Sequence, residues 1–202
     1  MKLIFIDNGH GLETKGKRSP NSLYIEAEWT REVARLVVES DELKALPVKV
    51  ELLVPEREDV SLPMRVSRVN ERCREIGSSE VCVISVHSNA SGDGSKWMGA
   101  KGWSVYTSPG NTKSDKIASI LYDKAEERFT WPRAIRIDMG DGDKDFESNL
   151  YLLKYTNCPA VLIENFFHDN EEDYIILMSS EGKRLCAEVI IETIKEICVK
   201  QL

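Results

Sequence analysis

The sequence predicts a single-domain α/β fold: a mostly parallel, mixed sheet with helices on both faces. Short apolar runs alternate along the chain with segments of helical periodicity, which is typical of a sheet flanked by helices. Several of the apolar runs are continuous rather than alternating, as strands buried on both faces are. The 202 residues show no repeat, linker or shift in composition. We therefore expect one domain over 1–202.

The elements follow in order along the chain. Five short runs rich in apolar residues are expected to be strands: 2–7 (KLIFID), 48–54 (VKVELLV), 80–86 (EVCVISV), 102–107 (GWSVYT) and 159–167 (PAVLIENFF). Four segments with apolar residues spaced by three and four are expected to be helices: 26–39, 65–76, 113–128 and 182–199. In the last of these, residues such as Leu185, Val189 and Ile197 recur on one face. Two long loops remain, at 88–101 and 136–148.

Composition excludes some classes of protein. The net charge is −7 and no dense Lys/Arg block occurs, so we expect no nucleic-acid partner. No apolar run approaches the ~20 residues of a membrane helix. The opening MKLIFIDNGHG is too short in apolar residues for a signal peptide and is better explained as the first strand. We therefore expect a protein made in the cytoplasm without a visible signal peptide.

Three histidines, His10, His87 and His168, are the only ones in the chain. Each comes just after, or at the end of, an apolar run. If these runs are parallel strands, the three imidazoles emerge at the same edge of the sheet, where sites on open α/β sheets gather. A single histidine at a strand end is more often structural. Three of them at strand ends, in a chain with so few histidines, favour a functional site.

Two neutral imidazoles and one carboxylate make a common zinc site, with a fourth position left for water. In the helix expected over 26–39, Glu26 lies on the apolar stripe with Trp29 and Val33, whereas Glu28 lies on the charged face. A carboxylate turned inward needs a cation. The alternative is a charge favoured by the helix N-terminus. Glu26 is therefore the best candidate for the third ligand.

A metal centre that activates water also needs a base. Glu164 interrupts the apolar run 159–167, where a strand would favour a hydrophobic residue. A carboxyl group in apolar surroundings has a raised pKa, which suits proton transfer near neutrality. The alternative is a carboxylate held by a salt bridge at a strand end. We predict that Glu164 is the catalytic acid and base.

Four motifs together resemble a known family. IDNGHG with His10, the inward Glu26, ISVHSNA with His87 and CPAVLIEN with Glu164 are similar in order and spacing to the zinc-dependent N-acetylmuramoyl-L-alanine amidases of the Amidase_3 type. The resemblance covers nearly the whole chain. It implies that His10, Glu26 and His87 bind one zinc ion per chain and that Glu164 is the catalytic residue. It also implies a mixed sheet with helices on both faces, and peptidoglycan as the substrate.

The sequence departs from the family pattern in two places. Thr30 stands where the family often has asparagine, four residues after the ligand glutamate. The segment after Glu164 is bulkier than usual, and His168 stands near a place where the family commonly has a hydroxyl residue. We expect His168 to line the cleft outside the metal's ligand set. We also expect Asn89, Asn165 and His168 to contact the substrate.

The resemblance predicts hydrolysis of the amide that joins the lactyl group of muramic acid to L-alanine. A zinc carboxypeptidase or endopeptidase would use the same ligand set. A wall-binding module without catalysis is the alternative from another class. We expect no separate wall-binding module in the chain, and either a bacterial or phage lysin released to the cell wall or a protein whose leader was removed. The stem-peptide specificity and the oligomeric state are left open.

Two further patterns have simpler explanations. The alternating Asp141, Asp143 and Asp145 resemble a calcium loop, but Phe146 stands where an EF-hand needs glycine. We therefore expect a solvated loop. Trp97 and Trp103 are candidates for a sugar-stacking platform, although residues of this kind more often cover a core.

Overall fold

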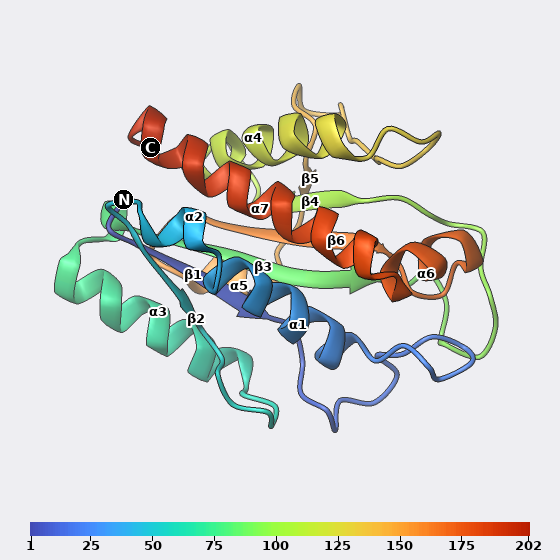
Figure 1. Ribbon diagram of the computed structural model, residues 1–202. Coiled ribbons are helices and arrows are strands. Elements are labelled where there is room, and N and C mark those ends of the chain that lie inside the picture. Colours follow the sequence, from blue (N-terminus) through green and yellow to red (C-terminus); the bar gives the residue numbers. More distant parts are fainter.

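A six-stranded sheet runs through the middle of the protein, which the computed structural model describes over all residues 1–202 (Figure 1). The strands are β1 (Leu3–Asn8), β2 (Lys49–Leu52), β3 (Val81–Asn89), β4 (Ser104–Thr107), β5 (Phe146–Glu147) and β6 (Ala160–Phe167). Their order across the sheet is β2-β1-β3-β6-β4-β5. The first four in this order are parallel, β4 is antiparallel to β6, and β5 is parallel to β4. The mostly parallel, mixed sheet predicted from the sequence is confirmed.

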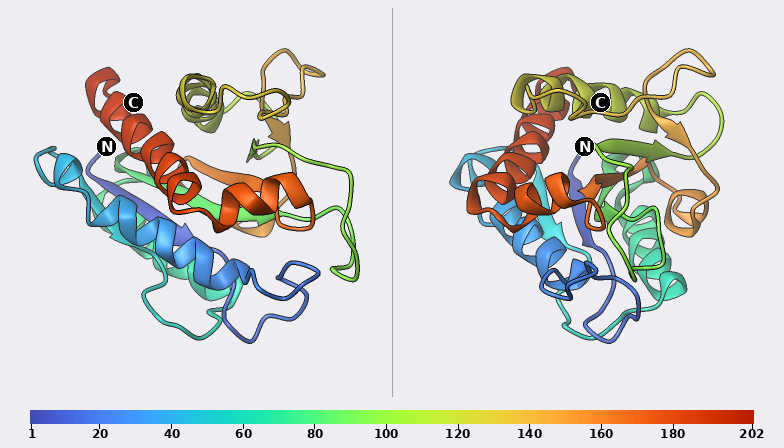
Figure 2. Two further views of the ribbon diagram at one scale, coloured as in Figure 1. Left: turned by 45° about the vertical axis from the view of Figure 1, so that its right-hand side comes forward. Right: turned by 90° about the vertical axis from the view of Figure 1, so that its right-hand side faces the viewer.

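Helices cover both faces of this sheet. They are α1 (Glu26–Val38), α2 (Asp41–Lys44), α3 (Leu62–Ile76), α4 (Lys113–Arg128), α5 (Tyr151–Tyr155), α6 (Glu171–Met178) and α7 (Ser180–Lys200), with a 3-10 turn at Ser78–Glu80. Figure 2 shows α1 and α7 on one side of the central strands and α3 on the other. None of these helices combines the length and the apolar character needed to cross a membrane.

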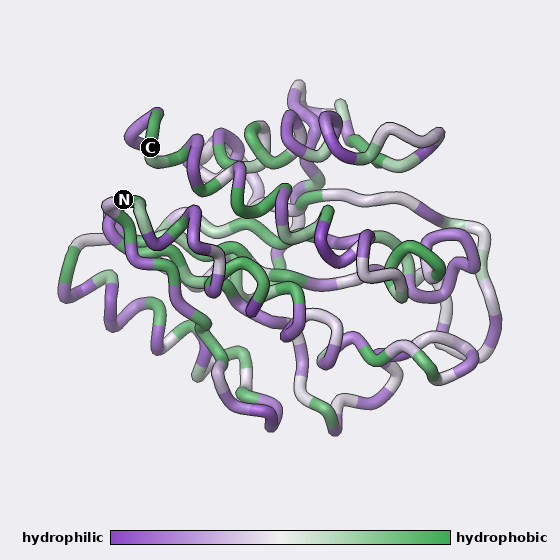
Figure 3. Tube along the Cα trace, in the orientation of Figure 1, coloured by the Kyte–Doolittle hydropathy of each residue, from purple (hydrophilic) through white to green (hydrophobic).

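The sheet separates two hydrophobic cores. The larger has 33 buried residues between the sheet and α1, α4 and α7, and the smaller has 13 between the sheet and α3 and α5. Along β3, Cys82, Ile84 and Val86 belong to the larger core, whereas Val81 and Val83 belong to the smaller one. Figure 3 shows the central strands as mostly hydrophobic, while the helices alternate in hydropathy along their length, as helices with one buried face do.

The same alternation determines on which face of the sheet the polar side chains at the strand ends lie. Successive side chains of a strand lie on opposite faces of the sheet. In β1, β3 and β6 the residues of the smaller core are followed, two or four positions later, by Asp7, Ser85, His87 and Glu164. These four side chains therefore lie toward the α3 and α5 side, at the carboxyl ends of three neighbouring parallel strands.

The observed elements differ from the predicted ones mainly where they are short. The helices over 26–39 and 65–76 are observed as α1 and α3, which starts at Leu62, and 182–199 is observed as α7. The run 48–54 gives only the short strand β2, which pairs with β1 alone and so forms an edge of the sheet. The elements β5, α2, α5 and α6 were not predicted, because each has at most eight residues, too few for a clear periodicity.

The two ends of the chain lie side by side (Figure 1). The amino group of Met1 donates a hydrogen bond to the carbonyl oxygen of Leu202 at 3.4 Å. Because Met1 leads directly into β1, both ends lie near the amino ends of the parallel strands, away from the edge that carries Asp7, His87 and Glu164.

Candidate metal centre

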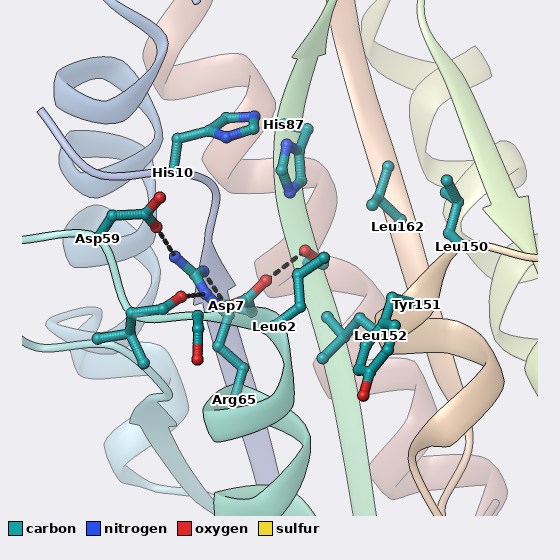
Figure 4. A pocket seen from close by; sticks show the side chains of 13 residues that line it. Asp7, His10, Asp59, Leu62, Arg65, His87, Leu150, Tyr151, Leu152 and Leu162 are labelled. Atoms are coloured by element: carbon teal, nitrogen blue, oxygen red, sulfur yellow. Dashed lines mark hydrogen bonds and ion pairs between the residues drawn. The ribbon is translucent and has the colours of Figure 1, made fainter. Parts of the chain in front are cut away.

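Three segments far apart in the sequence bring two histidines and a glutamate together. His10 follows the end of β1, Glu26 is the first residue of α1, and His87 lies near the end of β3. One ligand atom from each residue lies within 4.8 Å of the other two. Figure 4 shows the imidazole rings of His10 and His87 close to each other above a cavity. The three residues predicted as metal ligands thus lie together.

Glu26 is the buried centre of this group. Its side chain is 1% exposed, and Oε1 accepts a hydrogen bond from the backbone N–H of Ser88 at 3.1 Å. The same oxygen lies 3.0 Å from Nδ1 of His87 and 3.5 Å from Nε2 of His10. Burial alone would raise the pKa of Glu26, but the hydrogen bonds with His10 and His87 hold it well below its usual value.

The second carboxylate oxygen of Glu26, Oε2, is buried and has no hydrogen-bond partner. A buried carboxylate oxygen without a partner is rare, because losing its hydration is costly. A bound cation would satisfy it, and two imidazoles with one carboxylate are suitable ligands for zinc. The residues present therefore fit a metal ion. Glu28, by contrast, is exposed, as the helix phase predicts.

The turn that carries His10 depends on close packing. His10 has a left-handed backbone conformation with a φ of 61°, which is uncommon for a residue with a Cβ atom. A Cβ atom on Gly9 would lie 2.4 Å from Cε1 of His87, so only glycine fits there. The carbonyl oxygens of Gly9 and His10 accept hydrogen bonds from Thr30 Oγ1 at 3.1 Å and from Arg31 Nη1 at 3.0 Å. Thr30, which departs from the family pattern, thus anchors this turn.

Glu164 lies beside the three candidate ligands and is not one of them. It is the register partner of His87 across the parallel pair of β3 and β6. Its Oε2 is buried and has no partner, although the side chain as a whole is half-buried. Burial raises the pKa of Glu164 to about 7, and the negative charge of Glu26 adds to the rise while His87 opposes it. A raised pKa of this kind suits a carboxyl group that transfers protons.

His168 does not line the cleft as the sequence analysis expects. It is 0% exposed and its ring stacks on Tyr24 with the ring centres 5.5 Å apart. Its Nδ1 lies 3.0 Å from Oγ of Ser88, which accepts a hydrogen bond from the Tyr24 hydroxyl at 2.7 Å. Burial lowers the pKa of His168. Its contacts support Ser88, whose N–H holds Glu26. No pattern in the sequence points to Ser88 or Tyr24.

The two asparagines expected to contact substrate are engaged within the protein. Asn165 is 1% exposed. Its Nδ2 donates to the carbonyl oxygen of His87 at 3.0 Å, and its Oδ1 accepts from Nε1 of Trp103 at 3.2 Å. Oδ1 of Asn89 accepts from the N–H of Ala90 at 2.9 Å. The amide group of Asn165 is therefore buried within the protein, and its contacts hold the backbone of His87.

Trp103 is fully buried in the larger core, so it cannot stack on a sugar. Trp97 is half-buried and packs edge-to-face on Tyr174, with the ring centres 5.1 Å apart.

The expectation of a solvated loop is wrong for Asp145, which is 2% exposed. Its Oδ2 accepts a hydrogen bond from Thr107 Oγ1 at 2.6 Å. Burial raises the pKa of Asp145 to about 7, and the neighbouring Asp143 adds to the rise.

A buried ion pair lies at the bottom of the cavity beside the two histidines. Nη1 of Arg65 lies 2.6 Å from Oδ1 of Asp7, and the hydroxyl of Ser85 donates to Oδ2 of Asp7 at 2.5 Å. Nη1 of Arg65 also donates to the carbonyl oxygen of Asn8 at 2.7 Å. Figure 4 shows Asp7 and Arg65 below His10 and His87. The ion pair thus ties α3 to the end of β1, two residues before His10.

One edge of the mostly parallel sheet thus carries two imidazoles, a buried carboxylate and a carboxyl group of raised pKa. These are the groups that a metal-dependent hydrolase uses. The chain belongs to the Amidase_3 family of N-acetylmuramoyl-L-alanine amidases, whose model matches residues 4–196. The family indicated by the four sequence motifs is confirmed, and it is a family of amide hydrolases.

The chain is also similar to individual proteins of known name. An endolysin of Bacillus phage SPP1 is 26% identical over 205 residues, which cover 97% of this chain and 66% of the endolysin. The N-acetylmuramoyl-L-alanine amidase of Clostridium difficile 630 has a similar fold, with a TM-score of 0.80 at 21% identity over 97% of this chain and 96% of that one. The catalytic domain of CwlV from Bacillus (Paenibacillus) polymyxa has a TM-score of 0.76 at 21% identity, over 97% of each chain.

Proposed function

We propose that this chain is a zinc-dependent N-acetylmuramoyl-L-alanine amidase that hydrolyses the amide between the lactyl group of muramic acid and L-alanine in peptidoglycan. The observation that carries the proposal is the meeting of His10, Glu26 and His87 at one point, with the unpartnered carboxyl of Glu164 beside it. Family membership supports the substrate and the type of bond.

In this proposal His10, Glu26 and His87 hold one zinc ion per chain. The donor set and the unpartnered Oε2 of Glu26 support this assignment. When bound, zinc supplies a positive charge that polarises the amide carbonyl and lowers the pKa of a water molecule toward neutrality. Ser88 and Asn165 then act as positioning residues, since they hold the carboxylate of Glu26 and the backbone of His87.

Glu164 moves the protons. Its carboxylate accepts a proton from the attacking water and later returns it to the nitrogen of the leaving amine. A single group can do both because burial raises the pKa of this carboxyl group, which brings it toward the range in which a proton is both taken up and released. Its half-buried position leaves it accessible to a bound substrate while limiting its hydration.

The experiment is a peptidoglycan digest analysed by mass, with zinc content measured in the same preparation. An amidase releases intact stem peptides with a new L-alanine amino terminus and leaves muramic acid with a free lactyl carboxylate. Cleavage within the stem peptide would instead indicate a zinc peptidase. Stoichiometric zinc without any turnover would indicate a binding module.

We further propose that the protein acts on the cell wall as a released lysin. The support is its similarity to a protein named endolysin, from Bacillus phage SPP1. The chain spans 66% of the length of that relative, so the comparison concerns the catalytic part. A lysis assay on whole cells, with the protein added from outside or produced together with a pore-forming protein, tests this proposal.

A further inference from the structure

A pocket of about 360 Å³ beside β4 gathers three positively charged side chains. Its six lining residues are Gly99, Ala100, Lys101, Arg133, Ile135 and Arg136. No Asp or Glu is among them, although the whole chain carries a net charge of −7. None of them lines the cavity beside His10 and His87. The pocket is therefore separate from the candidate metal centre and has a cationic lining.

Two of the three positive charges have no carboxylate partner. Lys101 is paired with Glu172, so its charge is compensated. None of the arginine ion pairs of the chain includes Arg133 or Arg136. An anion that enters the pocket would therefore meet two arginines whose charge is not already neutralised.

The guanidinium of Arg136 lies over aromatic rings. Its Cζ is 5.0 Å from the ring centre of Phe167 and 5.4 Å from that of Phe146. Such rings contact the flat face of a guanidinium, and the N–H groups, which lie in its plane, remain available to an anion. Phe146 in turn stacks on Tyr106, with the ring centres 5.3 Å apart, and Tyr106 packs against the smaller core.

The backbone that carries Arg136 is also held on both sides. Its N–H donates to the carbonyl oxygen of Trp103 at 2.8 Å, and its own carbonyl oxygen accepts from the Tyr122 hydroxyl at 3.0 Å. The N–H of Trp103 donates to the carbonyl oxygen of Ala134 at 2.8 Å. A side chain whose backbone and flat face are already fixed loses little conformational freedom when it binds a ligand.

Arg136 lies on the same side of the sheet as Glu164. Ser104 in β4 is the register partner of Glu164, and the preceding Trp103 forms a parallel bridge with Ile135. Because neighbouring strands lie ~4.8 Å apart, the backbone of Ile135 is about 10 Å from that of Glu164. Ile135 packs against the larger core. Arg136, the next residue, therefore lies toward the opposite face, which carries Glu164.

This separation corresponds to the spacing of charges in the proposed substrate. While muramic acid is linked to its peptide, the saccharide chain has no free carboxylate there, so the anionic groups belong to the stem peptide. An extended peptide spans ~3.5 Å per residue, which places the second and third stem residues about 7–10 Å from the cleaved bond. A carboxylate on either residue can reach the two arginines. The lactyl carboxylate forms only at the cleaved bond itself and is too near to do so.

We propose that the pocket of Arg133 and Arg136 binds a free carboxylate on the second or third residue of the stem peptide. The inference rests on the proposed amidase activity and specifies its substrate. Arg136 supplies the planar pair of N–H donors that suits a carboxylate, and Arg133 adds a second charge. Both are specificity-determining residues that lie outside the metal's ligand set.

The test uses three synthetic muramoyl-tetrapeptides with an amidated C-terminus. The first has a free carboxylate on the second residue and lysine as the third. The second has a carboxamide and lysine at these places, and the third has a carboxamide and diaminopimelate, which adds a carboxylate to the lysine side chain. The zinc-loaded protein is assayed by mass measurement of the released peptide. We expect the first or the third substrate to exceed the second roughly fivefold in kcat/KM, mainly through a lower KM, the effect of a partly exposed ion pair. The substrate that does so identifies the carboxylate.

Variants of the arginines test the location. Arg136→Gln should remove the preference for the acidic substrate and leave the activity on the neutral one close to that of the parent protein. Arg133→Gln, at an exposed position, should reduce the preference and tests the pocket even if Arg136→Gln does not fold. Lys116→Gln removes an exposed positive charge of α4, outside the lining, and should leave the preference unchanged.

Calorimetric titration with the free stem peptides gives a second measurement that does not depend on turnover. The preferred acidic peptide should bind to the parent protein roughly fivefold more tightly than the neutral one, and equally to Arg136→Gln. Equal affinities and equal kcat/KM values for all three would overturn the proposal, and so would a preference that survives in both arginine variants. If neither the synthetic substrates nor whole peptidoglycan are cleaved, the proposed amidase activity is wrong, and the titration alone decides whether the pocket binds the carboxylate.

Discussion

His87 and Glu164 are direct partners across the parallel strands β3 and β6. Both side chains lie on the α3 and α5 side of the sheet, so a candidate metal ligand and the proposed base share one ladder of backbone hydrogen bonds. Asn165, next to Glu164, also donates a hydrogen bond to the carbonyl oxygen of His87 at 3.0 Å. The distance between ligand and base is therefore set by the sheet, whereas Glu26 is placed by a separate helix.

The first prediction is that His87→Ala removes zinc. Two remaining ligands, one of them partly exposed, cannot hold the ion tightly, so the zinc content should fall far below one per chain. Metal analysis of the purified variant measures this. His168→Ala is the matched control and should keep its zinc, because His168 lies outside the ligand group. Full zinc in His87→Ala would contradict the ligand assignment.

The second prediction separates two glutamates in the same helix. Glu26→Gln should lose both zinc and activity, because the neutral amide replaces a buried carboxylate that faces two imidazoles. Glu28→Gln should retain both, since Glu28 is exposed on the outer face of α1. Zinc content and amide cleavage are measured side by side. The opposite pattern would mean that Glu26 is only a structural carboxylate.

The third prediction concerns Glu164→Gln. Glutamine preserves the shape of the side chain but cannot accept the proton, so zinc should remain bound while kcat falls by ~10²–10⁴-fold or more. Zinc content and turnover are measured in the same preparation of the variant. Loss of zinc would make Glu164 a ligand, and near-normal turnover would remove it from the proposed mechanism.

The fourth prediction concerns pH and stability. The pKa of Asp145 is about 7 in the folded protein and about 3.9 in an unfolded chain. The folded state therefore keeps a proton that the unfolded state releases, and stability falls as pH rises between these two values. The negative charges of Asp143 and Asp115 also raise this pKa and so contribute to the effect.

Asp145→Asn resembles the protonated carboxyl group and can still accept the hydrogen bond from Thr107. Its Tm should therefore decline less than that of the parent protein between pH 5 and pH 8. Thermal unfolding at several pH values measures the slope. Asp141→Asn, at an exposed position in the same loop, should leave the slope unchanged. An identical slope for Asp145→Asn would mean that another group causes the pH dependence.

The fifth prediction tests the ion pair beneath the site. Arg65→Met leaves the carboxylate of Asp7 buried without a cation, which should destabilise the fold by about 3–5 kcal/mol. The double variant Arg65→Met with Asp7→Asn should recover part of this loss, since an amide carries no charge. Denaturant unfolding of the single and double variants gives the coupling. Additive losses would show that the pair contributes no mutual stabilisation.

The central strands and the meeting of His10, Glu26 and His87 were predictable because they follow from simple periodicities. Apolar runs gave β1, β3 and β6, and parallel pairing brings their carboxyl ends to one edge. The phase of α1 distinguished Glu26 from Glu28. These inferences need only side-chain spacing within one element and the general rule for open sheets.

The position of His168 could not be predicted in this way. The pairing of β3 with β6 shifts register between His87 and Asn89, and Phe166 has a left-handed φ of 63°. This bulge changes the direction of the chain just before His168, so extrapolating the strand's alternation fails. The Asp7–Arg65 pair was missed for a different reason: its members lie 58 positions apart, and no local pattern links them.

The meeting of the two chain ends, at Met1 and Leu202, bears on how the protein could be re-engineered. A short peptide could join the ends without spanning the edge that carries His10, Glu26 and His87, since the ends lie near the opposite ends of the parallel strands. New ends could then be opened in the exposed turn at Asp141 and Gly142, where no strand is cut. Such a circular permutant would keep His10, Glu26 and His87 in place while changing their order along the chain. Activity in that protein would depend on the folded arrangement alone, and not on the succession of motifs by which the family is recognised.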